Sequence, residues 1–295
     1  MSFKDTLSMN KASKEIILGT ANLGQKYGIT NNRLFNPSDS LSILNYAITR
    51  GIRHFDTAPD YGSAHSLLSN ILVDNNDLKI TTKISSKLIG KTEKILDHFS
   101  QSLSDLNIDS VDTVLFHSSD FVSTDNFKEI VTALLETKKI KNIGVSIYEK
   151  SEIANVLETG AEINTFQVPE NILDQRLVND REMFTYRSQG ISFIVRSVFL
   201  QGLLLSDLKN IPKSFLHAMD KIQIISSLAE KNKVSKVDIC MSYAFDIGWA
   251  DKVLIASASI NQLEEILNFR KINVAFDQIP RLPLELIDPR KWPNQ

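Results

Sequence analysis

Short apolar runs alternate along the chain with longer segments in which apolar residues recur every three or four positions. A short run bounded by Gly, Pro or polar residues predicts a buried strand, and the wider spacing predicts an amphipathic helix. The runs predict strands at residues 16–19, 52–55, 79–84, 111–117, 143–146, 165–168, 191–197 and 252–257. The spaced segments predict helices at residues 38–48, 63–72, 92–106, 125–137, 149–158, 179–189, 214–246 and 262–269, the seventh broken near Val234-Ser235.

The order of these elements predicts the fold. Nearly every strand is followed by a helix, and such alternation implies a parallel sheet with right-handed crossovers. Eight strand–helix units in about 250 residues are typical of a closed (β/α)8 TIM barrel. A doubly wound open sheet is the alternative, but it normally carries a G-x-G-x-x-G turn, which Thr20–Gln25 does not fit. We therefore expect a single barrel domain over residues 1–295, in which Thr20–Gly24 is a loop.

Two local signals extend this prediction. Asn36-Pro37-Ser38-Asp39 is typical of a helix start, and Ser38 is the expected N-cap. The segment from Asn273 to Gln295 contains four prolines. We expect this C-terminal extension to be ordered and to cross one mouth of the barrel, because its large apolar residues need cover: Phe276, Leu282, Leu284 and Trp292.

Composition and charge exclude some classes of partner. The chain has 295 residues, 42% hydrophobic and 23% charged, with a formal net charge of -2. These ordinary values, with both signs mixed, indicate no surface for nucleic acid or an anionic membrane. No stretch approaches the roughly 18 apolar residues of a membrane helix, and Met1–Lys14 lacks the apolar core of a signal peptide. Cys240 is the single cysteine, so no intrachain disulfide can form, and we expect a cytoplasmic protein.

Three predicted strands end on ionisable residues. The stretch His54–Gly62 begins as a strand and becomes a loop, with Asp56 at the end of the strand and Tyr61 five residues later. The next two strands end at Lys83 and His117. Because neighbouring parallel strands have their carboxyl ends at one edge of a sheet, we expect these four side chains to meet there. That edge is where α/β sheets carry their chemistry.

These four residue types suit the protonation of a carbonyl oxygen. An unperturbed phenol has a pKa of about 10 and is a poor proton donor near neutral pH. The Lys83 ammonium would stabilise the phenolate and lower that pKa, and the Asp56 carboxylate would hold the ammonium. His117 would orient the carbonyl while a hydride reaches its carbon. Each residue alone also fits a structural role, as a turn cap, a loop aromatic, a solvated lysine or a rim histidine. Four compatible groups on three consecutive strand ends favour a catalytic site.

At these positions the chain resembles the aldo-keto reductase family. His54–Gly62 looks like the Asp and Tyr motif of that family, and Lys83 and His117 look like its Lys and His positions. The resemblance continues in family order from about residue 16 to residue 269. The further matching segments are Gly144-Val145-Ser146, Phe166-Gln167-Val168 with Asn171, Ser197 with Gln201–Leu204, and Ser257–Glu265.

The resemblance implies a barrel reductase that uses a nicotinamide cofactor without a Rossmann domain and without a metal. Tyr61 would be the general acid for a small-molecule aldehyde or ketone. NADPH is the expected cofactor because the family favours it, with NADH as the alternative. The resemblance assigns the nicotinamide carboxamide to Ser146 and Gln167, and the adenosine end to Ser257 and Glu265. It places four more residues in the remaining cofactor-binding segments: Arg196, Ser197, Gln201 and Gln262.

The nicotinamide end departs from the family pattern at two positions. Ile147 stands where Asn is common, and Arg196 stands where an aromatic residue commonly stacks on the nicotinamide. A guanidinium can stack on a ring, but it is unfavourable beside a cationic nicotinamide. Two alternatives remain for Arg196: it faces an anionic substrate or phosphate, or it forms a salt bridge with Glu170 on the adjacent strand.

The adenosine end departs as well. Ala256 and Gln262 stand where the family often has cations that would meet the 2′-phosphate of NADP. Arg270 and Lys271, one turn later, are candidate substitutes. His65 stands where an acidic residue is common, and we expect it to be an exposed residue of the first helical turn.

Two other classes of function stay open. A regulatory barrel that binds cofactor with little turnover fits the altered carboxamide and stacking positions. An unrelated (β/α)8 isomerase or aldolase would use Lys83 as a Schiff-base amine, but Asp56 beside it would keep the amine charged and poorly nucleophilic. The sequence predicts neither the physiological substrate nor the oligomeric state.

Overall fold

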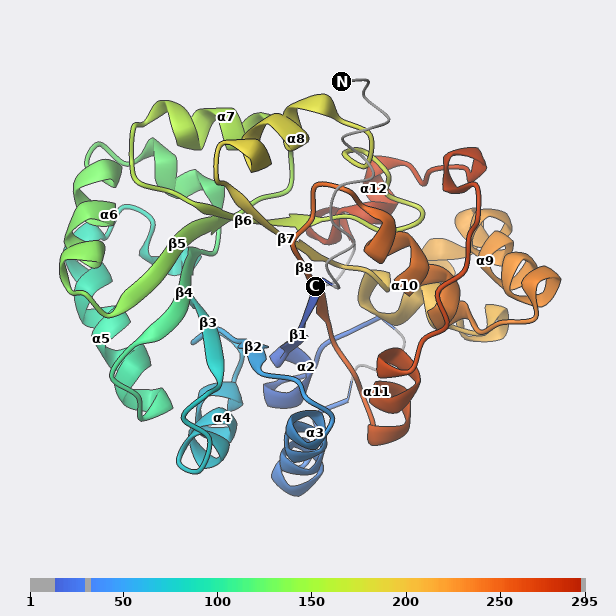
Figure 1. The fold of residues 1–295 in the computed structure, drawn as a ribbon, viewed down its shortest axis with the longest axis horizontal. Coiled ribbons are helices and arrows are strands. Elements are labelled where there is room, and N and C mark those ends of the chain that lie inside the picture. Colours follow the sequence, from blue (N-terminus) through green and yellow to red (C-terminus); the bar gives the residue numbers. More distant parts are fainter. Residues whose placement is uncertain (1–13, 30–32, 293–295) are drawn as a thin grey trace.

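The computed structural model describes residues 14–29 and 33–292. Eight parallel strands form a closed barrel in chain order, and Figure 1 shows the helices outside this ring. The predicted (β/α)8 TIM barrel is thus confirmed, and the doubly wound open sheet is excluded. The strands are β1 (Glu15–Gly19), β2 (His54–Asp56), β3 (Lys79–Ile84), β4 (Val111–Phe116), β5 (Ile140–Ser146), β6 (Thr165–Pro169), β7 (Ser192–Arg196) and β8 (Lys252–Ile255).

Helices follow the strands and pack an apolar face against the barrel. The helix of residues 95–106, for example, buries Phe99, Leu103 and Leu106, which recur at helical spacing. The helices are α2 (Ala21–Gly24), α3 (Pro37–Thr49), α4 (Ala64–Leu72), α5 (Ile95–Leu106), α6 (Phe127–Glu136), α7 (Ser151–Glu158), α8 (Arg181–Ser188), α9 (Met219–Asn232), α10 (Lys236–Asp246), α11 (Ile260–Leu267) and α12 (Leu284–Ile287).

Two local expectations about the first part of the chain are wrong. Residues 20–24 are not a plain loop, because Ala21–Gly24 form the short helix α2. The N-cap of α3 is Asn36 rather than Ser38, since the Asn36 side chain accepts a hydrogen bond from the Asp39 backbone N–H at 2.8 Å. Pro37 then takes the first helical position, where its missing N–H leaves no donor unpaired.

The long helical region before β8 is broken where the sequence predicts. Helix α9 is followed by Lys233 in the left-handed conformation (φ 53°), which ends it. Helix α10 begins after Ser235, which forms a capping box with Asp238. The Ser235 hydroxyl accepts from the Asp238 N–H at 3.1 Å, and the Asp238 carboxylate accepts from the Ser235 N–H at 2.9 Å.

The strand order brings the predicted chemistry to one edge. Asp56 is the last residue of β2, Lys83 lies one residue before the end of β3, and His117 directly follows β4. Strand β2 pairs with β3, and β3 pairs with β4, in parallel. The three strand ends therefore lie side by side at the carboxyl edge of the barrel, as predicted.

The described residues of the C-terminal extension, 273–292, lie at the carboxyl mouth of the barrel. Leu282 and Trp292 are buried, and Phe276 and Leu284 are half-buried. The Leu282 N–H donates to Leu173 O at 2.8 Å, and the Trp292 indole donates to Leu286 O at 3.1 Å. The predicted extension across one mouth is confirmed over residues 273–292.

Three expectations concern absences or chain ends. The stretch on which the signal-peptide prediction rests, residues 1–13, lies outside the described residues. Within the described ranges, no helix is both long and apolar enough to cross a membrane. The same ranges contain no group of three or more His, Cys, Asp or Glu side chains that could hold a metal ion.

Candidate active site

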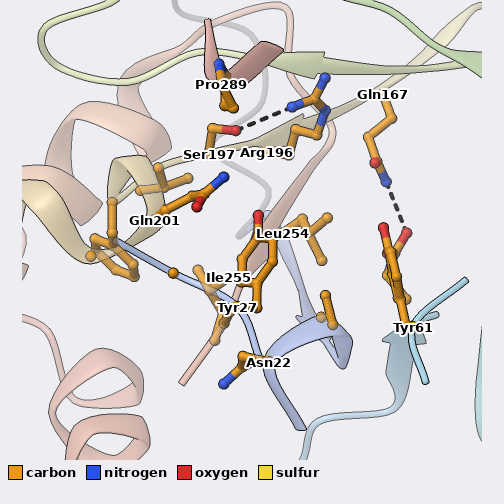
Figure 2. Close-up of a pocket in the computed structure, with 18 of the residues that line it drawn as sticks. Asn22, Tyr27, Tyr61, Gln167, Arg196, Ser197, Gln201, Leu254, Ile255 and Pro289 are labelled. Carbon is orange, nitrogen blue, oxygen red and sulfur yellow. Dashed lines mark hydrogen bonds between the residues drawn. The ribbon is translucent and has the colours of Figure 1, made fainter. Parts of the chain in front are cut away.

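A cavity of about 970 Å³ lies at the carboxyl edge of the barrel. This volume is at the upper end of the roughly 300–1,000 Å³ that ligand pockets span. Residues at or just after the ends of β1, β2, β4, β5, β6, β7 and β8 line it, together with the C-terminal extension. Figure 2 shows side chains from these separate segments converging on one space. Since a TIM barrel carries its active site at this edge, the cavity is the candidate active site.

Asp56, which lines this cavity, forms a buried ion pair with Lys83. The side chains of Lys83 and Asp56 are 1% and 3% exposed, and the Lys83 ammonium donates to Asp56 Oδ1. It also donates to Thr57 O at 3.2 Å. Burial lowers the pKa of Lys83, and the Asp56 carboxylate opposes that shift. A buried charge without its partner is strongly destabilising, so each residue of this pair fixes the other.

Tyr61 lies over this pair with its hydroxyl toward His117. The phenol oxygen is 3.4 Å from His117 Nε2, and the Lys83 ammonium is 4.9 Å from the centre of the Tyr61 ring. Burial raises the pKa of Tyr61 well above its usual value, the Asp56 carboxylate adds to the shift, and the Arg196 guanidinium opposes it. The expectation of a Tyr61 pKa lowered by Lys83 is therefore wrong for this cavity. Tyr61 keeps its proton at neutral pH.

His117 is held between Tyr61 and Asp60. Its Nδ1 is 3.9 Å from Asp60 Oδ2, and the other Asp60 oxygen accepts a hydrogen bond from Lys87 Nζ at 2.7 Å. Burial lowers the pKa of His117, against the effect of Asp60, so the imidazole is neutral at neutral pH. The imidazole and the Lys87 ammonium together hold the pKa of Asp60 well below its usual range. Asp60 thus stays charged and orients the ring.

Two glycines allow the loop that carries Tyr61 to adopt its conformation. A Cβ on Gly24 would lie 2.0 Å from Tyr61 O, and one on Gly62 would lie 2.2 Å from Gly24 O. Gly62 also has a φ of +58°, which is costly for other residues. The Ser63 N–H donates to Gly24 O at 3.0 Å and fixes this close approach.

Four residues that the resemblance assigns to cofactor binding, two of them to the nicotinamide carboxamide, lie on the cavity wall. Ser146, Gln167, Ser197 and Gln201 all line it. Gln167 contacts the proton-donor side of the cavity, because its amide Nε2 donates a hydrogen bond to Asp56 Oδ2 at 2.9 Å. Ser197 and Gln201 have positive φ values of 63° and 53°, so the chain turns sharply after β7. Such left-handed conformations outside glycine are costly and cluster at functional sites.

The opposite end of the cavity is built around the start of α11. Ser257 and Gln262 line it, and the Gln262 amide oxygen accepts from the Ala258 N–H at 2.7 Å. Asn22 donates its amide to Ser257 O at 2.7 Å, while its buried Oδ1 has no partner among the described residues. An anion is favoured at a helix N-terminus, where backbone N–H groups lack partners.

Three residues proposed for the adenosine end lie elsewhere. Glu265 is exposed and is not part of the cavity wall. Arg270 donates to Lys233 O at 2.7 Å, and Lys271 forms an ion pair with Asp246. These two cations are thus turned toward α9 and α10, and neither replaces the cations that the family places at this end.

Arg196 does not form the salt bridge with Glu170 that its place on β7 suggested. Its guanidinium donates to Ser197 Oγ at 3.2 Å and to Ile147 O at 3.1 Å, and lies over the Tyr148 ring at 4.4 Å. Glu170 is buried elsewhere and accepts from the Tyr243 hydroxyl at 2.6 Å. Arg196 therefore remains on the cavity wall as a cation.

His65 is buried rather than exposed as expected. It is 5% exposed, and its Nε2 lies 3.3 Å from Thr82 Oγ1. Burial lowers the pKa of His65 to about 4. The ring lies between α4 and β3, outside the cavity wall, so it belongs to the packing of the barrel.

Four contributors to the site were not identified from the sequence. Asn22 lies shortly after β1 and Asp60 shortly after β2, and polar side chains so near strand ends were a usable signal. Tyr148, two residues after β5, and Arg290, in the C-terminal extension, carry no local pattern that predicts a place in the cavity.

Comparison with known sequences places these features in context. The model of the aldo/keto reductase family matches residues 15–283. An L-galactose dehydrogenase from Arabidopsis thaliana is 26% identical over 254 residues, which cover 77% of this chain and 76% of the relative. A glyoxal reductase from Bacillus subtilis is 26% identical over 229 residues, covering 75% of each chain. A D-galacturonate reductase from Fragaria ananassa is 28% identical over 147 residues, which span 46% of that relative.

Solved structures share the fold. A glycerol dehydrogenase from Gluconobacter oxydans superposes with a TM-score of 0.68 at 19% identity and covers 90% of both chains. An aldo-keto reductase from Bacillus halodurans, in its holo form, gives a TM-score of 0.70 at 18% identity, covering 92% of this chain and 89% of that one. At such identities the likeness concerns the fold alone.

Proposed function

The chain belongs to the aldo/keto reductase family, whose model spans nearly all of its barrel, and from that premise we propose that it reduces an aldehyde or ketone with a nicotinamide cofactor. Membership in this family supports the view that the protein is an oxidoreductase that acts on small-molecule carbonyl compounds. The observation that carries the mechanism is the Tyr61 hydroxyl, 3.4 Å from a neutral His117 and directly above the Lys83–Asp56 pair.

Tyr61 is the proposed general acid. Its raised pKa keeps the phenol protonated, so the proton is present when a carbonyl oxygen binds. His117, oriented by Asp60, positions that oxygen beside the phenol. As the oxygen takes the proton, negative charge develops on Tyr61, and the Lys83 ammonium at 4.9 Å from its ring stabilises that charge. Lys83 thus acts in the transition state rather than in the resting enzyme.

The wall of the cavity fits a nicotinamide dinucleotide. The Asn22 amide oxygen, which has no partner among the described residues, and the N-terminus of α11 supply polar groups at one end, and Ser146 and Gln167 supply them near Asp56. When bound, the reduced nicotinamide supplies a hydride to the carbonyl carbon. Ser146 and Gln167 are proposed to hold its carboxamide, and Ser197, Gln201, Ser257 and Gln262 to hold the remainder.

The choice between NADPH and NADH depends on the 2′-phosphate. The family resemblance favours NADPH. The cavity wall from Leu254 to Gln262 contains no Lys or Arg, and Arg270 and Lys271 are engaged elsewhere. A phosphate without a cation loses the charge-assisted hydrogen bonds that normally select it. We propose that NADH serves at least as well as NADPH.

The function is tested by the loss of reduced-nicotinamide absorbance with a panel of aldehydes and ketones. We expect turnover that falls by about 10²–10⁴-fold in Tyr61→Phe, the usual contribution of a general acid. Cofactor binding, measured by fluorescence titration, should not change in that variant. Turnover unchanged in Tyr61→Phe would refute the mechanism. Tight cofactor binding by the wild type without any turnover would instead favour the regulatory barrel.

A further inference from the structure

The guanidinium groups of two arginines lie over one aromatic ring on the wall of the catalytic cavity. The guanidinium carbon of Arg196 lies 4.4 Å from the centre of the Tyr148 ring, and that of Arg290 lies 3.7 Å from it. All three side chains line the cavity. They come from the end of β7, the segment after β5 and the C-terminal extension, so three distant parts of the chain build this one feature.

The two arginines differ in how their charge is balanced. Arg290 donates to both oxygens of Asp288, at 3.0 Å and 2.7 Å, and so forms a neutral pair with a carboxylate that is 1% exposed. Arg196 donates to the hydroxyl of Ser197 and the carbonyl of Ile147, which are both uncharged acceptors. Its Nε is buried and has no partner among the described residues, and no ion pair involves it there.

The other charged groups on the wall do not neutralise Arg196. Asp56 is paired with Lys83, and Asp120 is an exposed residue that accepts from Ser118. Arg33 adds a further positive charge over the Phe35 ring, at 4.5 Å. The wall therefore has an excess of positive charge, and no carboxylate of the described residues forms an ion pair with Arg196.

Arg196 and the proton donor Tyr61 line the same cavity. Figure 2 shows it beside Gln167 on the wall that faces Tyr61, and Pro169 on β6 is its strand partner. Its charge opposes the rise in the pKa of Tyr61 that burial causes. A group bound to Arg196 therefore lies in the same cavity as a carbonyl bound to Tyr61.

We propose that the carbonyl substrate carries an anionic oxygen group, a carboxylate or a phosphate, and that Arg196 binds this group. The inference rests on the proposed reductase function. The Tyr148 ring, which the neutral Arg290–Asp288 pair also contacts, restricts the movement of the Arg196 guanidinium that lies over it. A planar guanidinium held in this way can bind a carboxylate or phosphate through a fork of N–H groups.

Matched substrates test the proposal. One pair is 4-formylbenzoate and its methyl ester, and the other is glyceraldehyde 3-phosphate and glyceraldehyde. We expect the wild type to favour the anionic member of at least one pair by about 10–100-fold in kcat/KM, the range for hydrogen bonds to a charged group. The pair with the larger ratio distinguishes a carboxylate from a phosphate.

Variants assign the preference to one residue. Arg196→Met should remove that preference, lowering kcat/KM for the anionic members about 10–100-fold more than for the neutral members. Arg196→Lys, which keeps the charge but not the fork, should retain part of it. Arg53→Met is the matched control. Arg53 carries the same charge but forms an ion pair with Asp77 next to the amino end of β2, away from the cavity. The Arg53→Met variant should therefore prefer the anionic substrates as strongly as the wild type does.

A binding measurement separates this inference from the reductase function. The alcohol product 4-(hydroxymethyl)benzoate and its methyl ester are titrated calorimetrically into wild type and Arg196→Met. Selective binding of the acid without any turnover would refute the reductase function and leave the inference standing. Turnover with equal values for both members of both pairs would overturn the inference alone. A loss in Arg196→Met that is confined to cofactor affinity would also overturn it, because Arg196 would then bind the cofactor.

Discussion

Gln167 donates its side-chain amide to Asp56 across the barrel, from β6 to β2, at 2.9 Å. Asp56 uses its other oxygen to accept the Lys83 ammonium. The Asp56 carboxylate thereby connects Gln167, which is assigned to cofactor binding, with Lys83, which supports the proton donor. The two halves of the proposed reaction are not independent, and a change at Gln167 should affect both.

Gln167→Leu tests this connection. We expect weaker cofactor binding, by about tenfold, because one hydrogen bond to the carboxamide is lost. We also expect the free energy of unfolding to fall by about 1–3 kcal/mol, because Asp56 Oδ2 loses its buried donor. Fluorescence titration and urea unfolding measure the two effects. Ser146→Ala is the control, since it should weaken cofactor binding without reducing the free energy of unfolding. Equal stabilities of Gln167→Leu and wild type would contradict the connection.

Asp60→Asn tests the orientation of His117. Asp60 raises the pKa of His117 against burial, so removing its charge should lower that pKa further. Because the neutral imidazole is the active form, the acid limb of the pH profile of kcat/KM should move to lower pH. Loss of ring orientation should reduce kcat/KM by about tenfold, as for other partners that orient a functional histidine. Lys87→Met, which removes only the exposed partner of Asp60, should leave most of the activity. An unshifted acid limb would argue against Asp60.

Cofactor preference tests the charge of the cavity wall beside α11. We expect kcat/KM with NADH to equal or exceed that with NADPH. Ala256→Lys should raise the NADPH-to-NADH ratio by about tenfold, because the new cation can meet the 2′-phosphate. Arg270→Ala should leave the ratio unchanged, since its guanidinium donates to Lys233 O outside the cavity. A strong wild-type preference for NADPH would mean that a cation outside Leu254–Gln262 binds the phosphate.

The sequence predicts the barrel well because its strands are short apolar runs that are buried on both faces. Phe166 and Val168 of β6, for example, are both 0% exposed. Helix α2 was missed because four residues are too few to express a helical period. The N-cap of α3 was misplaced because Asn36 and Ser38 are both good caps, and only Pro37 at the first helical position distinguishes them.

The site is predictable where it depends on strand ends. Asp56, Lys83 and His117 follow from the strand order alone. The Arg196–Tyr148 stack was not predicted, because it depends on the conformation of two loops and the C-terminal extension. The raised pKa of Tyr61 was not predicted either, since burial rather than the nearest cation decides its direction.

His65 could have been placed correctly from helical spacing. Leu68 and Leu72, three and seven positions later on α4, are 0% and 7% exposed, so His65 at 5% lies on the same buried face. Its polar character suggested exposure, but the Thr82 hydroxyl, 3.3 Å from its Nε2, provides a polar contact inside. Its Nδ1 is buried with no partner among the described residues.

This burial predicts a specific acid sensitivity. Burial lowers the pKa of His65 from 6.5 to about 4, so the unfolded chain binds its proton first as the pH falls. Stability should be complete above pH 6.5 and should decline by about 3 kcal/mol as the pH approaches 4. Urea unfolding should show that the free energy of unfolding falls less steeply between pH 6.5 and pH 4 in His65→Gln, because glutamine does not titrate. Thr82→Val keeps the imidazole and should retain the wild-type slope. Equal slopes for wild type and His65→Gln would assign the acid limb to other groups.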